Sequence, residues 1–250
     1  MKYELTENTQ VVNDKTLYQI RALRDIGDRV KAGDLGGWVP NQTYLNQKGD
    51  CWIDKDVKVS DQIHITSNAY ITGDLIINDY GWIGDDAYID ADGTFGGTKS
   101  ICDNARIASD DPNRRIRLDI SHYGTYTNLV GNVWIKHDFS SKCFLYVKDN
   151  VTIDCPIDIG SDSVHLAGNE TILIPPTVFK DRWPITITPK YINIGCEHHT
   201  AEEWFAFDDV TIADMDVEAL DWWKAKKETI HNLHRSQVNA LKSIEMLLTE

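Results

Sequence analysis

Hydrophobic side chains recur at every sixth position between Cys51 and Asp110. Ten such residues follow one another at this spacing: Ile53, Val59, Ile65, Ile71, Ile77, Ile83, Ile89, Phe95, Ile101 and Ile107. Two positions before each of them runs a second column of mostly small or aliphatic residues, in which Lys99 is the exception. A helix repeats every 3.6 residues and an ordinary strand every two, so neither produces this pattern.

Both columns point to the same face of a short strand, because side chains alternate along a strand. The residues that follow each strand are rich in Asp, Gly, Ser and Asn, which favour turns. Three such sides close a triangular coil of about 18 residues, and successive coils stack at about 4.8 Å. Ile71 then lies between Ile53 and Ile89, and each contributes about 1.5 to 3 kcal/mol of burial. The sequence therefore predicts a mainly β fold, in the form of a parallel β-helix. We expect a charged residue in the column of Ile53, Ile71 and Ile89 to unfold a coil.

The spacing resembles the hexapeptide repeat of left-handed parallel β-helices, and the left hand is implied by that resemblance. We expect the helix to occupy residues 51–175. A second block in the same period runs from Val133 to Ile159, slips by one residue at Val164 and fades near Pro175.

Between the two blocks, residues 109–132 break the six-residue period. We expect an irregular excursion from the helix there. The alternation of Ile116, Leu118 and Ile120 predicts a strand within it.

Residues 1–50 are expected to form an N-terminal cap, because a stacked helix exposes unpaired backbone and core at its first coil. Residues 16–21 have the pattern of a strand, and the segment Gly33–Val39 that of a tight turn leading into a capping strand. The glycines of this segment do not form a phosphate loop, since no Gly-Lys-Ser/Thr and no helix signal follow them.

Residues 176–250 are expected to form a strand followed by an α-helical segment. Tyr191–Gly195 predicts the strand, Thr200–Glu203 is a capping box, and apolar residues recur at threes and fours after Asp216. The apolar surface of the long helix is wider than an isolated helix tolerates, so we expect it to pack on the β-helix or on copies of itself. The residues expected at a contact between copies are Trp222, Trp223, Ile230, Leu241, Ile244 and Leu248.

The chain is acidic, since 39 Asp and Glu against 25 Lys and Arg leave a net charge of −14. This argues against direct binding of DNA or RNA, whose phosphates bind basic surfaces. No stretch approaches the roughly 18 to 20 apolar residues that span a bilayer, and the N-terminus lacks the apolar run of a secretory signal. The five scattered cysteines predict reduced thiols. We therefore expect a cytosolic protein with no membrane contact.

The known proteins with this repeat include acyltransferases, which resemble one another in using a histidine near a coil corner as general base. The candidates here are His64, His122, His137 and His165. None of them lies in a sequence that matches an acyltransferase motif, and His64 is expected to be a solvent-exposed side chain. The segment Cys196–His199 offers zinc-ligand types without a second ligand pair elsewhere. We expect no catalytic residue, no metal and no cofactor.

One local concentration of basic and aromatic residues lies in the predicted excursion. It comprises Arg114, Arg115, Arg117, His122, Tyr123 and Tyr126. Such a set can hold phosphates and stack a base, and we take it as the candidate ligand-binding site. The alternative is that the arginines pair with neighbouring aspartates, Asp110, Asp111 and Asp119, across a surface loop.

Three segments together resemble a family of phage and prophage proteins: residues 33–39, the hexapeptide run, and residues 192–200 before a Trp-containing helix. The members of this family are known mainly as uncharacterised hexapeptide β-helix proteins. The resemblance therefore implies the fold and a viral origin, and it provides no catalytic residue.

These observations favour a phage-encoded, non-enzymatic binding protein that acts in the host bacterial cytoplasm against an antiviral defence. It would sequester a small nucleotide signal or block a host defence protein. Many hexapeptide β-helices are trimers, so we expect a homo-oligomer and favour a trimer. The alternatives are an acyl- or nucleotidyl-transferase of the hexapeptide class and a structural virion protein.

Overall fold

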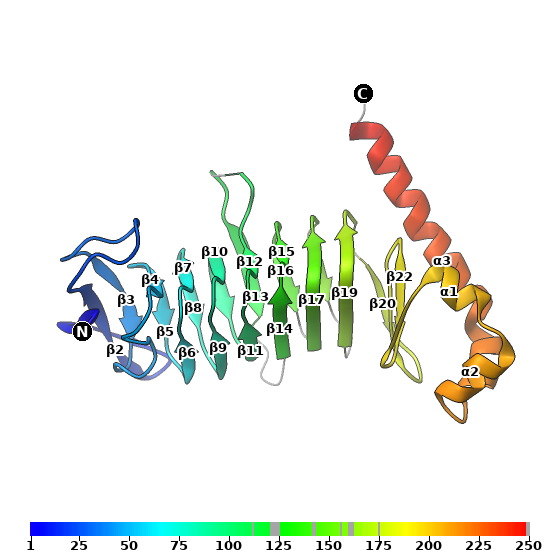
Figure 1. Ribbon diagram of the computed structural model, residues 1–250, viewed down its shortest axis with the longest axis horizontal. Helices are drawn as coiled ribbons and strands as arrows, with labels where there is room; N and C mark the ends of the chain where they lie inside the picture. The colour runs from blue at the N-terminus through cyan, green and yellow to red at the C-terminus, as the bar shows by residue number, and fades with distance from the viewer. Residues whose placement is uncertain are drawn as a thin grey trace.

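The computed structural model describes residues 1–111, 113–120, 126–141, 144–155, 157–159, 163–174 and 176–248. The chain forms a parallel β-solenoid of about six turns, followed by a small antiparallel sheet and three helices (Figure 1). The predicted left-handed parallel β-helix with an N-terminal cap and a C-terminal α-helical segment is confirmed.

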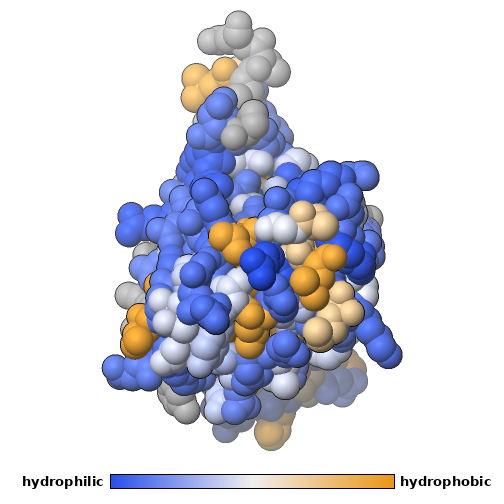
Figure 2. Space-filling model, turned by 90° about the vertical axis from the view of Figure 1, so that its left-hand side faces the viewer, coloured by the Kyte–Doolittle hydropathy of each residue, from blue (hydrophilic) through white to orange (hydrophobic). Residues whose placement is uncertain are grey.

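The cap consists of a hairpin and one further strand. Strands β1 (Tyr3–Val12) and β2 (Lys15–Ala22) pair antiparallel, and β3 (Leu35–Val39) joins β2 to the first coil through a parallel contact of Trp38 with Lys58. The outer surface at this end is mostly hydrophilic, with apolar side chains scattered between polar ones (Figure 2). The cap therefore covers the open end of the core, as the sequence predicts.

Two glycines explain why the cap can lie so close to the first coil. A Cβ atom on Gly36 would lie 2.4 Å from the ring of Trp52, and one on Gly37 would lie 2.5 Å from the carbonyl oxygen of Val57. Gly36 and Gly37 are therefore used for close packing.

Within the described residues, sixteen strands build the solenoid, and strands of successive coils pair in parallel. They are β4 (Trp52–Ile53), β5 (Lys58–Val59), β6 (Ile63–Ile65), β7 (Tyr70–Thr72), β8 (Leu75–Ile77), β9 (Gly81–Ile83), β10 (Tyr88–Phe95), β11 (Thr98–Ile101), β12 (Arg106–Ile107), β13 (Ile116–Ile120), β14 (Tyr126–Gly131), β15 (Trp134–Ile135), β16 (Phe139–Ser141), β17 (Phe144–Ile153), β18 (Ile157–Ile159) and β19 (Ser163–Ile172). The last of these ends close to the predicted limit at Pro175.

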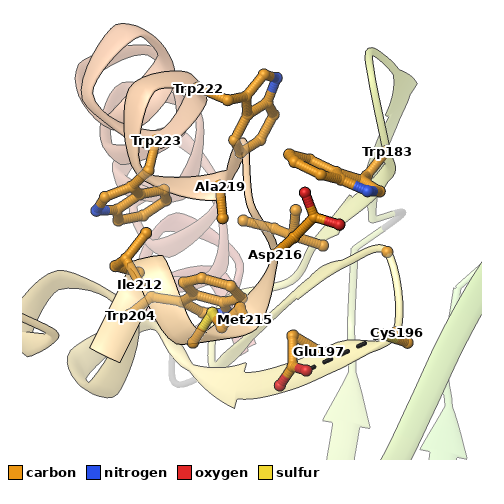
Figure 3. A pocket seen from close by; sticks show the side chains of 12 residues that line it. Trp183, Cys196, Glu197, Trp204, Ile212, Met215, Asp216, Ala219, Trp222 and Trp223 are labelled. Carbon is orange, nitrogen blue, oxygen red and sulfur yellow. Dashed lines mark hydrogen bonds between the residues drawn. The ribbon is translucent and has the colours of Figure 1, made fainter. Parts of the chain in front are cut away.

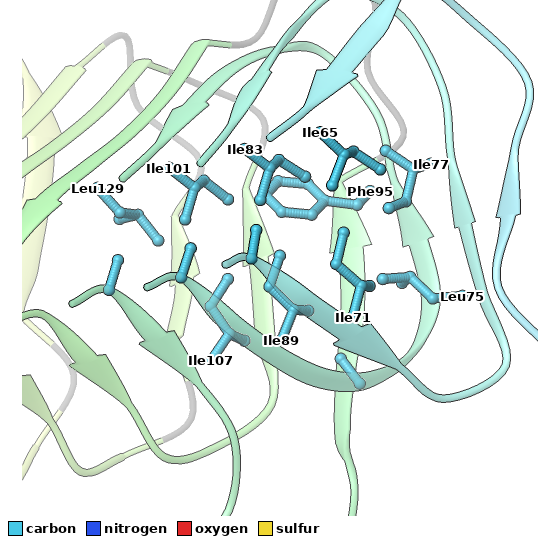
Figure 4. Close-up of a cluster of buried hydrophobic side chains, with 14 of the residues drawn as sticks. Ile65, Ile71, Leu75, Ile77, Ile83, Ile89, Phe95, Ile101, Ile107 and Leu129 are labelled. Atoms are coloured by element: carbon cyan, nitrogen blue, oxygen red, sulfur yellow. The ribbon is translucent and has the colours of Figure 1, made fainter. Parts of the chain in front are cut away.

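The core is a stack of aliphatic side chains inside the coils (Figure 4). Ile53 pairs with Ile71, and Ile71 with Ile89, so residues 18 apart in the sequence lie one above the other as predicted. All three are fully buried. The one charged residue of the inward columns, Lys99, is also buried, and its ammonium group donates to the carbonyl oxygens of Asn78 and Gly97.

The corners of the coils are held by polar side chains that repeat along the axis. The amide of Asn104 donates to Asn132, and that of Asn132 donates to Asn150, at 2.8 and 2.9 Å. Side-chain amides stacked in this way hydrogen-bond to each other across coils, which stabilises the stacking register.

Gly73 occupies a corner where a side chain does not fit. Its φ is +109°, and a Cβ atom would lie 2.0 Å from the carbonyl oxygen of Ala91. We expect Gly73→Ala to lower the free energy of unfolding by about 3 kcal/mol or more, because backbone strain and a backbone clash add. Gly33→Ala is the matched control: Gly33 has a φ of +97° but nothing within 4 Å, so only the strain of about 1 kcal/mol applies. Urea denaturation of both variants measures the difference, and equal losses would contradict the clash.

The predicted excursion at residues 109–132 is shorter than expected. Strand β13 pairs in parallel with β10 and β16, and β14 pairs with β11 and β17, so both belong to the solenoid. The alternation of Ile116, Leu118 and Ile120 is confirmed as the buried side of β13. The described part of the interruption is the segment between β12 and β13, which projects from the solenoid (Figure 1). The six-residue period fails here because the alternation of buried and exposed residues in β13 continues over all five positions from Ile116 to Ile120.

After the solenoid, four antiparallel strands form a separate small sheet. They are β20 (Thr177–Lys180), β21 (Pro184–Ile187), β22 (Tyr191–Ile194) and β23 (Glu197–Thr200). Helices α1 (Ala201–Ala206), α2 (Asp209–Met215) and α3 (Ala219–Leu248) follow. The predicted capping box of Thr200 and Glu203 is confirmed, since each side chain accepts from the other's backbone N–H. Within the described residues, no helix combines the length and apolar character that a membrane crossing requires.

The first half of α3 packs on this small sheet. Trp223 and Ile230 are buried there, and the ring of Trp222 meets Trp183 edge to face at 5.1 Å between centroids. The sequence predicts packing on the β-helix or on copies of the helix, whereas this half of α3 packs on the small sheet that follows the solenoid.

The last turns of α3 project away from the solenoid (Figure 1). Leu241 and Ile244 are half-buried there, and the side chain of Leu248 lies outside the described part of the chain. Association of copies through this helix, and the favoured trimer, stay predictions.

Candidate functional site

One outer face of the solenoid carries a column of aromatic and basic side chains. It is formed by the outward residue of successive coils, which pair in parallel register: Trp52, Tyr70, Tyr88, Arg106 and Trp134. We call this column the ladder face. It runs along strands β4, β7, β10, β12 and β15, so the fold itself places these residues one coil apart.

Aromatic rings and cationic groups contact one another along the ladder face. The rings of Tyr70 and Tyr88 are stacked with centroids 5.9 Å apart. The guanidinium of Arg106 lies 4.5 Å from the ring centroid of Tyr88 and 5.5 Å from that of Trp134. The ammonium of Lys136 lies 4.4 Å from the ring centroid of Trp134. Cation–π contacts of this kind are each worth about 0.5 to 2 kcal/mol and hold the side chains in place.

At its N-terminal end the ladder face forms one wall of a hollow of about 410 Å³. The opposite wall is the cap loop, which we define as residues 26–30. From this loop the guanidinium of Arg29 reaches over the rings of Tyr70 and Tyr88, at 4.6 and 5.3 Å from their centroids. The hydroxyl of Tyr70 donates to Asp54 at 2.7 Å, and burial raises its pKa.

At its C-terminal end the ladder face leads to a histidine bonded to a carboxylate. His137 follows strand β15, and its Nε2 lies 2.9 Å from Oδ1 of Asp154 on the next coil. Both side chains are about 30% exposed, so a substrate can reach them. Lys136 places its ammonium 3.6 Å from the second oxygen of Asp154.

The partners of His137 determine its tautomer. Its Nδ1 lies 3.1 Å from a guanidinium nitrogen of Arg114, and a guanidinium only donates hydrogen bonds. Nδ1 is therefore the hydrogen-bond acceptor. Nε2 carries the proton, and this N–H donates a hydrogen bond to Asp154. A histidine held in this way has one nitrogen that can accept a proton and one that is fixed by a carboxylate.

The arginines predicted to bind a ligand point to different neighbours. Arg114 contacts His137 and pairs with Asp138 at 3.2 Å, while Arg115 pairs with Asp90 at 3.0 Å. Arg115 and Arg117 also line a separate hollow beside β13. His122 and Tyr123 lie outside the described residues, as does the side chain of Tyr126. Ligand binding by this set as a whole stays a prediction.

The other candidate residues have ordinary surroundings where they are described. His64 is exposed on a different face, as predicted, and the side chains of His122 and His165 lie outside the described residues. In the segment 196–199, His198 stacks on Tyr191, and His199 contacts Glu197 at 3.1 Å and two aromatic rings. These contacts are those of structural packing.

Asp85, Cys102 and Asp103 bring three possible metal-ligand atoms within 4.8 Å of one another at a coil corner. Asp85 accepts from the backbone N–H of Asp103, and Asp103 accepts from that of Gly131. Burial raises the pKa of the Cys102 thiol, which disfavours the thiolate that a metal requires. The two carboxylates therefore act as corner acceptors for the next coil.

A second hollow lies between the small sheet and the helices, where Trp183, Trp204, Trp222 and Trp223 surround it (Figure 3). It encloses only about 90 Å³, whereas ligand pockets usually measure about 300 Å³ or more. This hollow is a packing gap between large rings, and the ladder face is the better candidate site.

Sequence reasoning missed the ladder face because it followed the inward columns. The signal was present in the outward column, where Trp52, Tyr70 and Tyr88 recur every 18 residues and Arg106 follows at the same spacing. Trp134 is displaced by the interruption between β12 and β13, so only the three-dimensional register joins it to the column.

Comparison with known proteins gives one partial likeness. No model of a known protein family matches the chain. A protein of Escherichia coli strain K12, described as the uncharacterized acetyltransferase YdcK, is 35% identical over 97 residues. The likeness covers 33% of this chain and 29% of that protein, so the chain matches less than a third of its relative's length. Membership of a phage or prophage family stays a prediction.

Proposed function

We propose that the protein is an acyltransferase in which His137 is the general base. The observation that carries this proposal is the hydrogen bond of 2.9 Å between His137 and Asp154 at an accessible corner of the solenoid. The partial likeness to a protein described as an acetyltransferase supports the same reaction class. The acyl donor would be a thioester, and the acceptor a hydroxyl or amine.

The proposed reaction needs one proton acceptor that later returns the proton. Nδ1 of His137 takes the proton of the acceptor as its oxygen or nitrogen forms a bond to the thioester carbonyl carbon. The carbon–sulfur bond then breaks, and the departing thiolate receives the proton from the imidazolium. Asp154 keeps the ring oriented and stabilises the positive charge that it carries between the two steps.

Arg114 donates a hydrogen bond to Nδ1 of His137, the nitrogen that acts as the base in this mechanism. Its side chain is about 41% exposed on the projecting segment, so an acceptor can displace it without disturbing the core. Arg106 adds positive charge along the ladder face, which favours an anionic donor in a chain whose net charge is −14.

Removal of the base is expected to abolish most of the activity. With acetyl-coenzyme A and a panel of amino sugars, sugars and amino acids, the wild type should release free thiol. His137→Ala should slow this release about 100- to 10,000-fold, the usual contribution of a general base. Asp154→Asn should slow it at least about tenfold, because the amide does not stabilise the imidazolium. The measurement is thiol release followed by absorbance, with circular dichroism to verify folding.

Two variants serve as controls. His64→Ala changes an exposed histidine on another face and should leave the rate unchanged. Arg114→Ala frees Nδ1 of His137 and should leave the maximal rate equal or higher. The proposal fails if the wild type releases no thiol with any acceptor, or if His137→Ala retains the wild-type rate.

The counter-defence function that the sequence favours first stays a prediction. The comparisons provide no relative of that kind, and the rigid scaffold by itself suits an enzyme as well as a binding protein. The same holds for a role as a virion component. Detection of the protein in purified particles or in complex with a host defence protein would test these alternatives.

A further inference from the structure

We propose that the hollow between the cap loop and the ladder face binds a phosphorylated sugar, with nucleoside diphosphates as the representative class. This site lies at the opposite end of the ladder face from His137, and the proposal does not depend on acyl transfer. It rests on the two arginines at the hollow, on the acceptors beside them and on the size of the space.

The two arginines are free to bind an anion. Arg29 comes from the cap loop and Arg106 from β12, and both guanidinium groups lie against the ring of Tyr88, at 5.3 and 4.5 Å from its centroid. Within the described part of the chain, neither of them forms an ion pair or a hydrogen bond through its side chain. At the rim, by contrast, Arg24 pairs with Asp50 at 3.1 Å. Two guanidinium groups held over one ring thus present donors that form no ion pair with a carboxylate among the described residues.

Guanidinium groups match phosphate better than other cations do. Their planar donors bind phosphate oxygens in pairs, and their weak hydration lowers the cost of leaving water. The ring contacts restrict the side chains before a ligand arrives, so less conformational entropy is lost on binding. Both arginines contact the ring of Tyr88, which brings two guanidinium groups to one ring and suits two linked phosphates.

The acidic side of the hollow suits the hydroxyl groups of a sugar. Asp86 lines it and accepts a hydrogen bond of 3.0 Å from the amide of Asn68, and Asp28 lines it from the cap loop. Carboxylates only accept hydrogen bonds at neutral pH, so this side of the hollow would repel phosphate groups but bind hydroxyls. The hollow therefore separates an anion-binding end from an end that binds hydroxyls.

The space has the right size for such a ligand. About 410 Å³ falls within the range of small-molecule sites, which is about 300 to 1,000 Å³. One wall is the solenoid and the other is the cap loop. The cap would then have a second role, as one side of a binding site.

Isothermal titration calorimetry of the full chain with ADP tests the proposal. We expect measurable binding that weakens as salt rises, because ion pairs with phosphate are screened. Inorganic pyrophosphate should bind more weakly than ADP, and adenosine should not bind. Arg29→Gln and Arg106→Gln should each weaken ADP binding at least tenfold, because each removes a charged hydrogen-bond donor.

Two matched variants separate this site from the rest of the chain. Arg235→Gln removes an arginine of helix α3, whose guanidinium donates to Asn232, and should leave ADP binding unchanged. His137→Ala should also bind ADP as the wild type does, so loss of acyl transfer and loss of nucleotide binding are independent results. The proposal is overturned if ADP does not bind, or if Arg29→Gln and Arg106→Gln, verified as folded, bind it with wild-type affinity.

Discussion

Ile89→Asp is expected to prevent the solenoid from folding. Ile89 is fully buried and pairs in register with Ile71 on one side and Ile107 on the other. A carboxylate there has no partner and no water, and burying an unpaired charge costs several kcal/mol in addition to the lost apolar contact. Because a domain of this kind is stable by only about 5 to 15 kcal/mol, one such change removes most of its stability.

The effect should spread beyond one coil. Each coil of a solenoid is stabilised mainly by its neighbours, so an unfolded coil in the middle exposes the core of both flanking parts. We therefore expect the variant to be insoluble or to lack the cooperative unfolding transition that the wild type shows by circular dichroism in urea.

Two substitutions control for size and for charge. Ile89→Val removes one methylene group and should cost about 0.5 to 1.5 kcal/mol. Ile76→Asp introduces the same charge in an outward position of β8, where the side chain is only half-buried, and should leave the transition cooperative. A soluble Ile89→Asp protein with a wild-type transition would show that the inward column is not a tightly packed core.

Lys99→Met is expected to remove a pH dependence of stability that the wild type shows above neutral pH. Lys99 is about 1% exposed, and burial lowers its pKa to about 7. In the unfolded chain a lysine titrates near 10.4. Between about pH 7 and pH 10 the unfolded state therefore binds a proton that the folded state has released, so the free energy of unfolding rises with pH in this window. The rise for three pKa units is on the order of 4 kcal/mol.

Two effects on the absolute stability of Lys99→Met oppose each other. The methionine avoids the cost of burying an amine, but it leaves the carbonyl oxygens of Asn78 and Gly97 without their donor. The decisive measurement is urea denaturation at several values between pH 6 and pH 10. Lys58→Met, which changes a lysine on an outward position, should keep the wild-type slope. Parallel curves for wild type and Lys99→Met would contradict a lowered pKa.

The candidate site was only partly predictable. His137 is one of the four histidines that the sequence presents, but nothing in its neighbours marks it, because its partner Asp154 lies 17 residues away and one coil above. Ligand binding by Arg114 stays a prediction, and its contact with His137 has no signal in the sequence. A hydrogen bond between coils depends on register, which local sequence does not encode.

The sequence by itself determined the solenoid. A six-residue period with aliphatic inward residues leaves few alternatives, because side-chain burial and turn preferences then agree at every coil. The cap strand, the capping box at Thr200 and the long C-terminal helix followed from equally local signals.

The tertiary structure alone decided which outward side chains lie together. The strands on both sides of the interruption between β12 and β13 continue in register, and this brings Trp134 into line with Arg106. It also places Arg29 of the cap over Tyr70 and Tyr88. Such contacts join residues from distant parts of the chain, so they arise only once the hydrophobic core has fixed the stacking of the coils.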